Sequence, residues 1–132
     1  MLLVDTSVWI ELLGGRVRGA GPDQLALICT CGPVVQEVIQ GLRTGPDADE
    51  FRLSLLALPC LCDPIPRSVY TQAAEIYREG RRRGYTIRSS YDCLIAAIAM
   101  ASGAAVWHRD RDYKNIAKFT PLVQFPNLSF PL

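Results

Sequence analysis

The stretch MLLVDTSVWIELL (residues 1–13) decides the fold. It begins with apolar residues typical of a short buried strand and continues as a predicted helix over 7–13, which Thr6 or Ser7 can cap. Between strand and helix stands Asp5, and a buried carboxylate is unfavourable unless it is paired or coordinates a cation. The rest of the chain must therefore supply a partner for Asp5.

Strands and helices alternate along the chain. The expected strands are 2–4, 60–65, 104–108 and 122–125, and 25–31 is either a strand or a helical segment because its periodicity does not decide. The expected helices are 7–13, 33–45, 47–58, 67–83, 91–102 and 112–119, with a glycine-containing loop at 14–23. This alternation predicts an α/β fold with a parallel sheet flanked by helices. In such sheets, ligands bind beyond the carboxyl ends of the strands.

Length and composition limit what the chain can be. Its 132 residues suit a single domain, 1–132, and with 49% hydrophobic and 20% charged residues it can bury a core. The formal net charge is only +1, so nucleic-acid binding would have to come from local patches of positive charge. Asp5 and Glu11 interrupt the N-terminal apolar run, and no apolar run is long enough to cross a bilayer. We therefore expect a cytoplasmic protein without a membrane segment.

The five cysteines include two C-x-C pairs, Cys29 with Cys31 and Cys60 with Cys62. This spacing differs from the C-x2-C of common zinc sites, and each pair lies in an apolar, strand-like context. We expect the cysteines to pack as small apolar side chains rather than to bind zinc or form disulfides.

Four acidic residues occupy comparable positions: Asp5 and Asp110 each follow an expected strand, and Glu37 and Asp92 lie in the first two turns of expected helices. Helical side chains lean toward the helix N-terminus, and neighbouring strands lie about 5 Å apart. The four acids can therefore converge if the first and penultimate strands are neighbours. Carboxylates that share a pocket repel each other unless a cation lies between them. An all-oxygen set suits Mg²⁺ or Mn²⁺, which can activate water and stabilise an in-line phosphoryl displacement.

Each acid also has a simpler interpretation. Asp5 can cap the helix that follows it, and Asp110 or Asp112 can cap the last helix. Glu37 can be a solvated helix residue, and Asp92 a favourable charge at a helix N-terminus. Position along the chain leaves both interpretations open.

Three blocks resemble the signature blocks of PIN-domain proteins, specifically VapC-type toxins: LVDTSVWIELL (3–13), GPVVQEVIQGL (32–42) and YDCLIAAIAMASGAAVWHRDRDYKNIAKF (91–119). They occur in the family's order and span nearly the whole chain. The resemblance implies a three-layer α/β/α sandwich with a central, mostly parallel sheet. It also implies a Mg²⁺- or Mn²⁺-dependent ribonuclease that cuts structured RNA, forms a homodimer and is held inactive by a small cognate antitoxin protein.

Carried onto this chain, the resemblance implies an acidic quartet of Asp5, Glu37, Asp92 and Asp110, with Asp112 as a supporting residue or a further metal ligand. Thr6 matches the hydroxyl residue that often follows the first aspartate. The chain departs from the family pattern at His108, where threonine or serine is common, and at Tyr113, where phenylalanine is usual. We interpret Tyr113 as a mild change. His108 can hydrogen-bond a carboxylate of the site or an RNA phosphate, but a structural role at the end of a strand is favoured.

An RNA substrate requires positive contacts beside the acidic pocket. Arg109, Arg111 and Lys114 flank Asp110 and are candidates for contact with phosphates. Another group either contacts phosphates as well or only complements a helix dipole: Arg78, Arg81, Arg82, Arg83 and Arg88. Both tryptophans, Trp9 and Trp107, are expected in the core or an interface rather than under a base.

The leading hypothesis is therefore a metal-dependent endoribonuclease that acts as a toxin. A haloacid-dehalogenase-type hydrolase would need a second aspartate two residues after the first, where Ser7 stands. A catalytically silent module that binds RNA or protein through the same fold is the other alternative. Such a module has no need to keep four mutually repelling acids.

Overall fold

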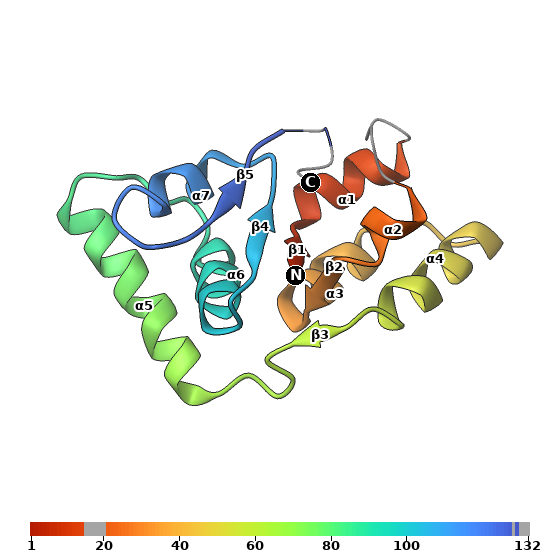
Figure 1. Ribbon diagram of the computed structural model, residues 1–132, viewed down its shortest axis with the longest axis horizontal. Helices are drawn as coiled ribbons and strands as arrows, with labels where there is room; N and C mark the ends of the chain where they lie inside the picture. Colours follow the sequence, from red (N-terminus) through yellow and green to blue (C-terminus); the bar gives the residue numbers. More distant parts are fainter. Residues whose placement is uncertain (15–20, 128, 130–132) are drawn as a thin grey trace.

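The computed structural model describes residues 1–14, 21–127 and 129 (Figure 1). Its strands are β1 (Leu2–Val4), β2 (Ile28–Cys31), β3 (Cys60–Leu61), β4 (Ala105–Trp107) and β5 (Gln124–Phe125). Its helices are α1 (Thr6–Leu13), α2 (Pro22–Leu25), α3 (Gly32–Gln40), α4 (Pro46–Leu56), α5 (Arg67–Arg82), α6 (Ser90–Ala101) and α7 (Arg111–Ile116). Strands and helices alternate, as the sequence predicts for an α/β fold.

The strands of the described residues form one five-stranded sheet in the order β3-β2-β1-β4-β5. Strand β1 is central, and its Leu2 pairs with Ile28 of β2 on one side and Ala105 of β4 on the other. All four pairings are parallel, so the carboxyl ends of the strands lie along one edge of the sheet. This confirms the predicted parallel sheet, and it confirms that the first and penultimate strands are neighbours.

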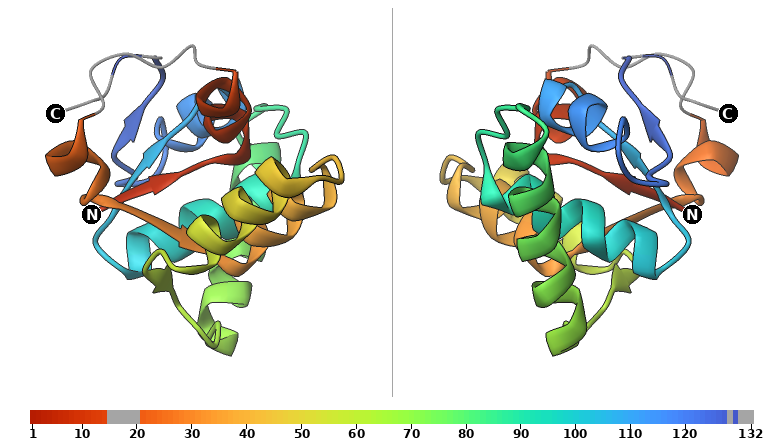
Figure 2. Two further views of the ribbon diagram at one scale, coloured as in Figure 1. Left: turned by 90° about the vertical axis from the view of Figure 1, so that its right-hand side faces the viewer. Right: turned by 90° about the vertical axis from the view of Figure 1, so that its left-hand side faces the viewer.

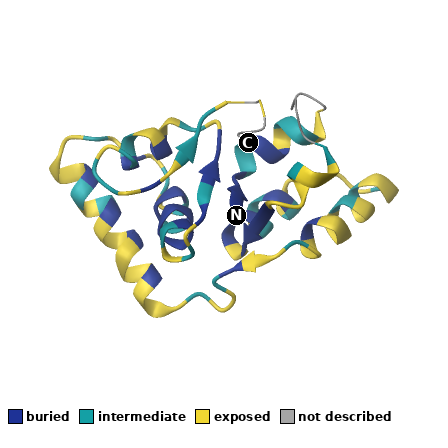
Figure 3. Cartoon of the chain, viewed as in Figure 1, coloured by how far each residue is buried: buried dark blue, intermediate teal, exposed yellow. Residues whose placement is uncertain are grey.

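Helices flank this sheet, in agreement with the predicted three-layer α/β/α arrangement (Figure 2). Helix α6 is the most buried of them, because its stretch from Ile95 to Ala99 lies entirely in the core. Its alanines allow close approach to α5, which packs along it and exposes its own outer face (Figure 3). The expected central position of this helix is therefore correct.

Some boundaries differ from the expected ones. Helix α3 ends at Gln40 rather than near residue 45, because Gly41 already takes the C-cap position. The ambiguous stretch 25–31 contains strand β2. The short helix α2 occupies part of the expected loop 14–23, of which residues 15–20 lie outside the described residues.

Both tryptophans are buried, as expected. Cys29, Cys31 and Cys93 are buried in the core, whereas Cys60 on β3 is exposed, so the packing role expected for the C-x-C pairs holds for only part of them. No helix within the described ranges combines the length and the apolar character that crossing a membrane requires.

Candidate active site

Asp5 directly follows β1 and is only 4% exposed. It caps helix α1, for which Thr6, Ser7 and Asp5 itself were the candidates, because its Oδ2 accepts the backbone N–H of Ser7 at 3.1 Å and the Ser7 hydroxyl at 2.5 Å. Its other oxygen, Oδ1, accepts the Tyr113 hydroxyl at 2.7 Å. Asp5 therefore caps a helix with one oxygen and takes part in a buried cluster with the other, so the two interpretations of the sequence are not exclusive.

Asp92 lies in the first turn of α6 and is 6% exposed. Its Oδ1 is 3.2 Å from the Tyr113 hydroxyl, and its Oδ2 is buried without a hydrogen-bond partner among the described residues. Burial, the neighbouring Asp112 carboxyl and repulsion from Asp5 raise the pKa of Asp92 to about 9. Without a cation, Asp92 therefore keeps its proton at neutral pH.

Asp110 and Asp112 complete a compact group with Asp92. Each of the three offers one carboxylate oxygen, and these oxygens lie within 4.8 Å of one another. Asp110 caps helix α7 by accepting the backbone N–H of Asp112 at 2.9 Å. Asp112 is 1% exposed and accepts the backbone N–H groups of Arg88 and Ser89, each with Oδ2 at 3.1 Å. It thus fixes the loop from which α6, and hence Asp92, begins.

Glu37 approaches the same pocket from α3. It is partly exposed, and its Oε1 accepts the Thr6 hydroxyl at 3.3 Å. Burial raises the pKa of Glu37, and repulsion from Asp5 and Asp110 adds to the effect. The acids expected to converge are therefore neighbours, although Asp5 and Glu37 lie outside the compact group of three.

His108 is fully buried at the end of β4 and bonds to no carboxylate among the described residues. Its Nδ1 accepts the backbone N–H of Asp110 at 3.0 Å, so Nε2 carries the hydrogen and donates to Gln124 Oε1 at 2.6 Å. Burial lowers the pKa of His108, which keeps the ring neutral. These contacts support the structural role at the strand end that the sequence favoured.

The structure gives Tyr113 more weight than the sequence did. Its hydroxyl lies between Asp5 and Asp92, which makes it a member of the cluster rather than a mild replacement of phenylalanine. Ser7 was also missed: it donates to Asp5 and accepts the backbone N–H of Arg109 at 2.9 Å. The one signal in the sequence was the departure from the family pattern at Tyr113.

The two groups of basic side chains differ in whether their charges are already paired with an acid. Glu79 binds Arg82 at 2.8 Å and Arg83 at 2.6 Å through their Nε atoms, and the two arginines hold the pKa of the Glu79 carboxyl down to about 2. Arg81 donates to the hydroxyl of Tyr77 at 3.2 Å. By contrast, the residues beside Asp110 are exposed, with no side-chain ion pair in the described part of the chain: Arg109, Arg111 and Lys114.

The chemistry of this pocket fits a divalent cation. Its donors are all carboxylate oxygens, the preferred ligands of hard ions. Asp92 Oδ2 is buried beside further carboxylates and has no donor among the described residues, so either a proton or a cation must compensate it. Asp92, Asp110 and Asp112 would hold such an ion, with Asp5 and Glu37 close by.

Comparison with known proteins agrees with the fold. The PIN domain family matches residues 2–119. Ribonuclease VapC11 from Mycobacterium tuberculosis H37Rv is 37% identical over 131 residues, which covers 92% of this chain and 96% of that protein. Ribonuclease VapC17 from the same strain is 32% identical over 130 residues, which covers 96% of this chain and 95% of that protein.

Solved structures give the same result for the fold. VapBC2 from Rickettsia felis, bound to a DNA fragment from its promoter, superposes with a TM-score of 0.71 at 16% identity. VapBC-1 from nontypeable Haemophilus influenzae gives a TM-score of 0.70 at 15% identity. Each match covers 94% of this chain and 96% of the other. Together with the sequence matches over nearly the whole length, these similarities show that the chain belongs to the PIN domain family.

Proposed function

We propose that this PIN-domain protein is a metal-dependent endoribonuclease and the toxin of a toxin–antitoxin pair. The observation that carries the proposal is the buried, unpartnered Oδ2 of Asp92 within a group of three carboxylates at the carboxyl edge of the sheet. The relatives named as ribonucleases support the reaction class. The solved relatives include one described as a toxin–antitoxin complex from Klebsiella pneumoniae, which supports an antitoxin as partner.

The donor set suits Mg²⁺ or Mn²⁺ better than zinc, because the pocket offers oxygens and no thiolate or free imidazole. When bound, such an ion supplies a nucleophilic water at neutral pH and neutralises charge that develops on the phosphate. Asp92, Asp110 and Asp112 are the proposed ligands, with Asp5 and Glu37 completing the acidic pocket.

Other side chains of the site orient the acids or bind the RNA. Thr6 orients Glu37 through its hydroxyl, and Asp112 fixes the start of α6. The exposed cations beside Asp110 are placed to contact phosphates of RNA: Arg109, Arg111 and Lys114. A protonatable general base is not needed, which agrees with the neutral, structural histidine of the site.

The test is cleavage of RNA by the purified protein. Total RNA is incubated with and without Mg²⁺ or Mn²⁺, and the Asp5→Asn variant runs in parallel. The expected result is metal-dependent fragments that the variant fails to make. Asp47→Asn is the matched control, because Asp47 is an exposed acid in the first turn of α4 and its variant should cut normally.

The same assay separates the enzyme from a silent binding module. Binding of RNA without metal-dependent fragments would favour the module, and equal cleavage by wild type and Asp5→Asn would overturn the assignment. Fragment ends mapped on cellular RNA would identify the substrate.

The toxin role and the assembly have separate tests. Expression of the wild-type chain should arrest growth, whereas expression of Asp5→Asn should not. Co-expression of a small protein encoded beside it should restore growth and copurify with the chain. For the proposed homodimer, light scattering should give twice the chain mass of 14.6 kDa.

A further inference from the structure

Tyr113 is a buried hydrogen-bond donor inside a cluster of acids. Its side chain is fully buried, and its hydroxyl lies 2.7 Å from Asp5 Oδ1 and 3.2 Å from Asp92 Oδ1. The two carboxylates come from different elements, one following β1 and the other in the first turn of α6. We propose that the Tyr113 hydroxyl is a positioning group that holds the Asp5 and Asp92 carboxylates in the geometry required for a divalent cation.

The hydrogen bonds of Asp5 leave little freedom to that carboxylate. Its Oδ2 accepts both the N–H and the hydroxyl of Ser7, and its Oδ1 accepts the hydroxyl of Tyr113. A carboxylate has about four acceptor positions, so the one that remains is on Oδ1. Ser7 is itself held by the backbone N–H of Arg109. Among the described residues, only Tyr113 donates to the oxygen that Asp5 can still offer to a cation.

Asp92 is oriented by the same hydroxyl. Its Oδ1 faces Tyr113, and its Oδ2 is the buried oxygen without a partner. Because a phenol has a single proton, it donates to one carboxylate at a time, and the shorter distance places it on Asp5. With Oδ1 beside the phenol, Oδ2 is the oxygen of Asp92 that has no donor among the described residues, and Asp92 forms a compact group with Asp110 and Asp112.

The ring that carries the hydroxyl cannot shift easily. It packs against the His108 ring with centroids 4.8 Å apart, and His108 is fixed at both nitrogens by Gln124 and by the backbone of Asp110. Phenylalanine at this position would fill nearly the same volume without the donor. The tyrosine therefore adds a fixed hydrogen-bond donor beside two acids. Hydrogen bonds from residues that do not themselves contact the metal are known to orient metal ligands.

The first test measures binding of Mn²⁺ to purified protein by calorimetry, without RNA. Tyr113→Phe should bind Mn²⁺ about 10- to 100-fold more weakly than wild type, the range typical when a partner of a metal ligand is removed. Tyr91→Phe is the matched control, because it also removes one phenol hydrogen bond. That bond runs from Tyr91 in α6 to Gln36 in α3, is 2.9 Å long and is exposed. The affinity of Tyr91→Phe for Mn²⁺ should equal that of wild type.

Unchanged Mn²⁺ affinity in Tyr113→Phe would overturn the proposal. Tighter binding would overturn it as well, since the hydroxyl would then compete with the cation. Should Tyr113→Phe fail to fold, Tyr113→Met offers a second variant, because a flexible apolar side chain fills the site without a donor to Asp5 Oδ1. The proposal requires Tyr113→Met to weaken Mn²⁺ binding as well, and normal binding by that variant would contradict it.

A kinetic test applies because the inference rests on the proposed function of this site. At saturating Mn²⁺, Tyr113→Phe should lower kcat for RNA cleavage and leave the KM for RNA unchanged, whereas a general structural defect would move both. Metal binding and catalysis can fail separately. If wild type never cuts RNA but Tyr113→Phe binds Mn²⁺ more weakly, the positioning role is supported and the nuclease is rejected. If wild type cuts RNA but Tyr113→Phe binds Mn²⁺ normally, the nuclease is supported and the positioning role is rejected.

Discussion

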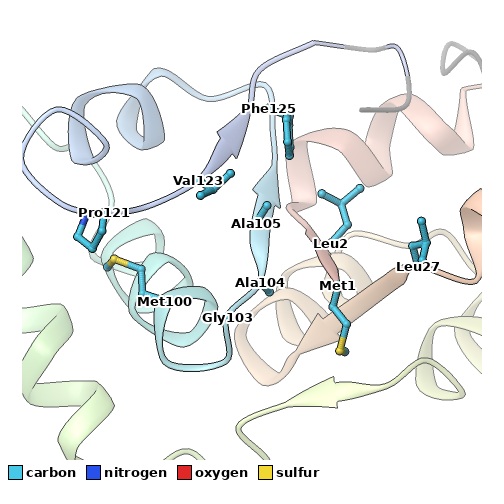
Figure 4. Close-up of a pocket in the computed structure, with 10 residues that line it drawn as sticks. All are labelled: Met1, Leu2, Leu27, Met100, Gly103, Ala104, Ala105, Pro121, Val123 and Phe125. Atoms are coloured by element: carbon cyan, nitrogen blue, oxygen red, sulfur yellow. The ribbon is translucent and has the colours of Figure 1, made fainter. Parts of the chain in front are cut away.

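The two ends of strands β1 and β4 carry opposite kinds of side chain. At their carboxyl ends stand Asp5 and the segment with His108 and Asp110, which bring polar groups into a buried pocket. At their amino ends lies an apolar hollow of about 490 Å³ (Figure 4). Its larger side chains are hydrophobic and come from the N-terminus, the residue before β2, the end of α6 and the region of β5: Met1, Leu2, Leu27, Met100, Val123 and Phe125.

This difference separates what stabilises the fold from what the site requires. Apolar burial is favourable and tolerates many arrangements of side chains, so the amino ends contribute stability without specific partners. Buried carboxylates are unfavourable unless each oxygen has a partner, and Asp92 Oδ2 has none among the described residues. In the metal-free protein Asp92 is compensated by taking up a proton, and a bound cation would replace that proton. Substitutions at the two ends should have opposite effects.

The largest expected effect is on activity, at the acidic end. Asp92→Asn should lower RNA cleavage by more than about 100-fold, because even the outer partners of metal ligands contribute about 10- to 100-fold. Stability of the metal-free protein should not fall and should rise near neutral pH, since folding there requires Asp92 to take up a proton that the asparagine amide does not need. Activity and stability are measured on one preparation: activity as RNA cleavage at saturating Mn²⁺, and stability as urea unfolding in EDTA.

Asp49→Asn is the control for Asp92→Asn, because Asp49 is an exposed acid that also lies in the first turn of a helix. It should alter neither quantity. If the rate of cleavage by Asp92→Asn stays within tenfold of wild type, the acidic end is not the part of the molecule on which activity depends.

At the apolar end the effect should fall on stability instead. Leu2 is 2% exposed, and Leu2→Ala should lower the free energy of unfolding by about 2–5 kcal/mol, the usual range for a large-to-small change in a core. Cleavage per folded molecule and Mn²⁺ affinity should be unchanged. Val123 lines the same hollow but its side chain is exposed, so Val123→Ala is the control. It should change the free energy of unfolding by less than about 0.5 kcal/mol. A loss of Mn²⁺ affinity in folded Leu2→Ala would show that the two ends are coupled.

The acidic end should also set how stability depends on pH. The pKa of Asp92 rises from 3.8 to about 9 on folding, so between these values the folded metal-free chain holds a proton that the unfolded chain has released. The contribution of Asp92 to stability should therefore be greatest at low pH and fall as pH rises from about 4 to 9, by on the order of 1 kcal/mol per pH unit at most. Melting temperatures in EDTA, measured on wild type and on Asp92→Asn, isolate this contribution from that of His108, whose lowered pKa acts in the opposite direction. Asp92→Asn should gain stability relative to wild type as pH rises, and a difference that stays constant over this range would contradict the prediction.

The contrast between the two ends was only partly predictable from the sequence. The parallel sheet and the placing of Asp5 and Asp110 at the ends of strands followed from local patterns, because parallel strands bring their carboxyl ends together. The order of the strands did not, and the neighbouring positions of β1 and β4 were only a condition that the structure meets. The hydrogen bond from Tyr113 to Asp5 joins residues 108 positions apart, and no local pattern marks such a contact. The same holds for Asp112, whose bonds to the backbone of Arg88 and Ser89 depend on how α7 packs beside the start of α6.

The smallest expected effect concerns the cations around the acidic end. Arg111 is exposed beside the pocket, whereas Arg82 is held by Glu79, so Arg111→Ala should weaken RNA binding a few-fold and Arg82→Ala should not. Losing one phosphate contact on a single strand lowers the slope of log affinity against log salt by about 0.7. Fluorescence anisotropy with labelled RNA, in the Asp5→Asn background to prevent cleavage, measures that slope for each variant. Equal slopes for Arg111→Ala and Arg82→Ala would mean that the ion pair with Glu79 does not decide which arginines meet RNA.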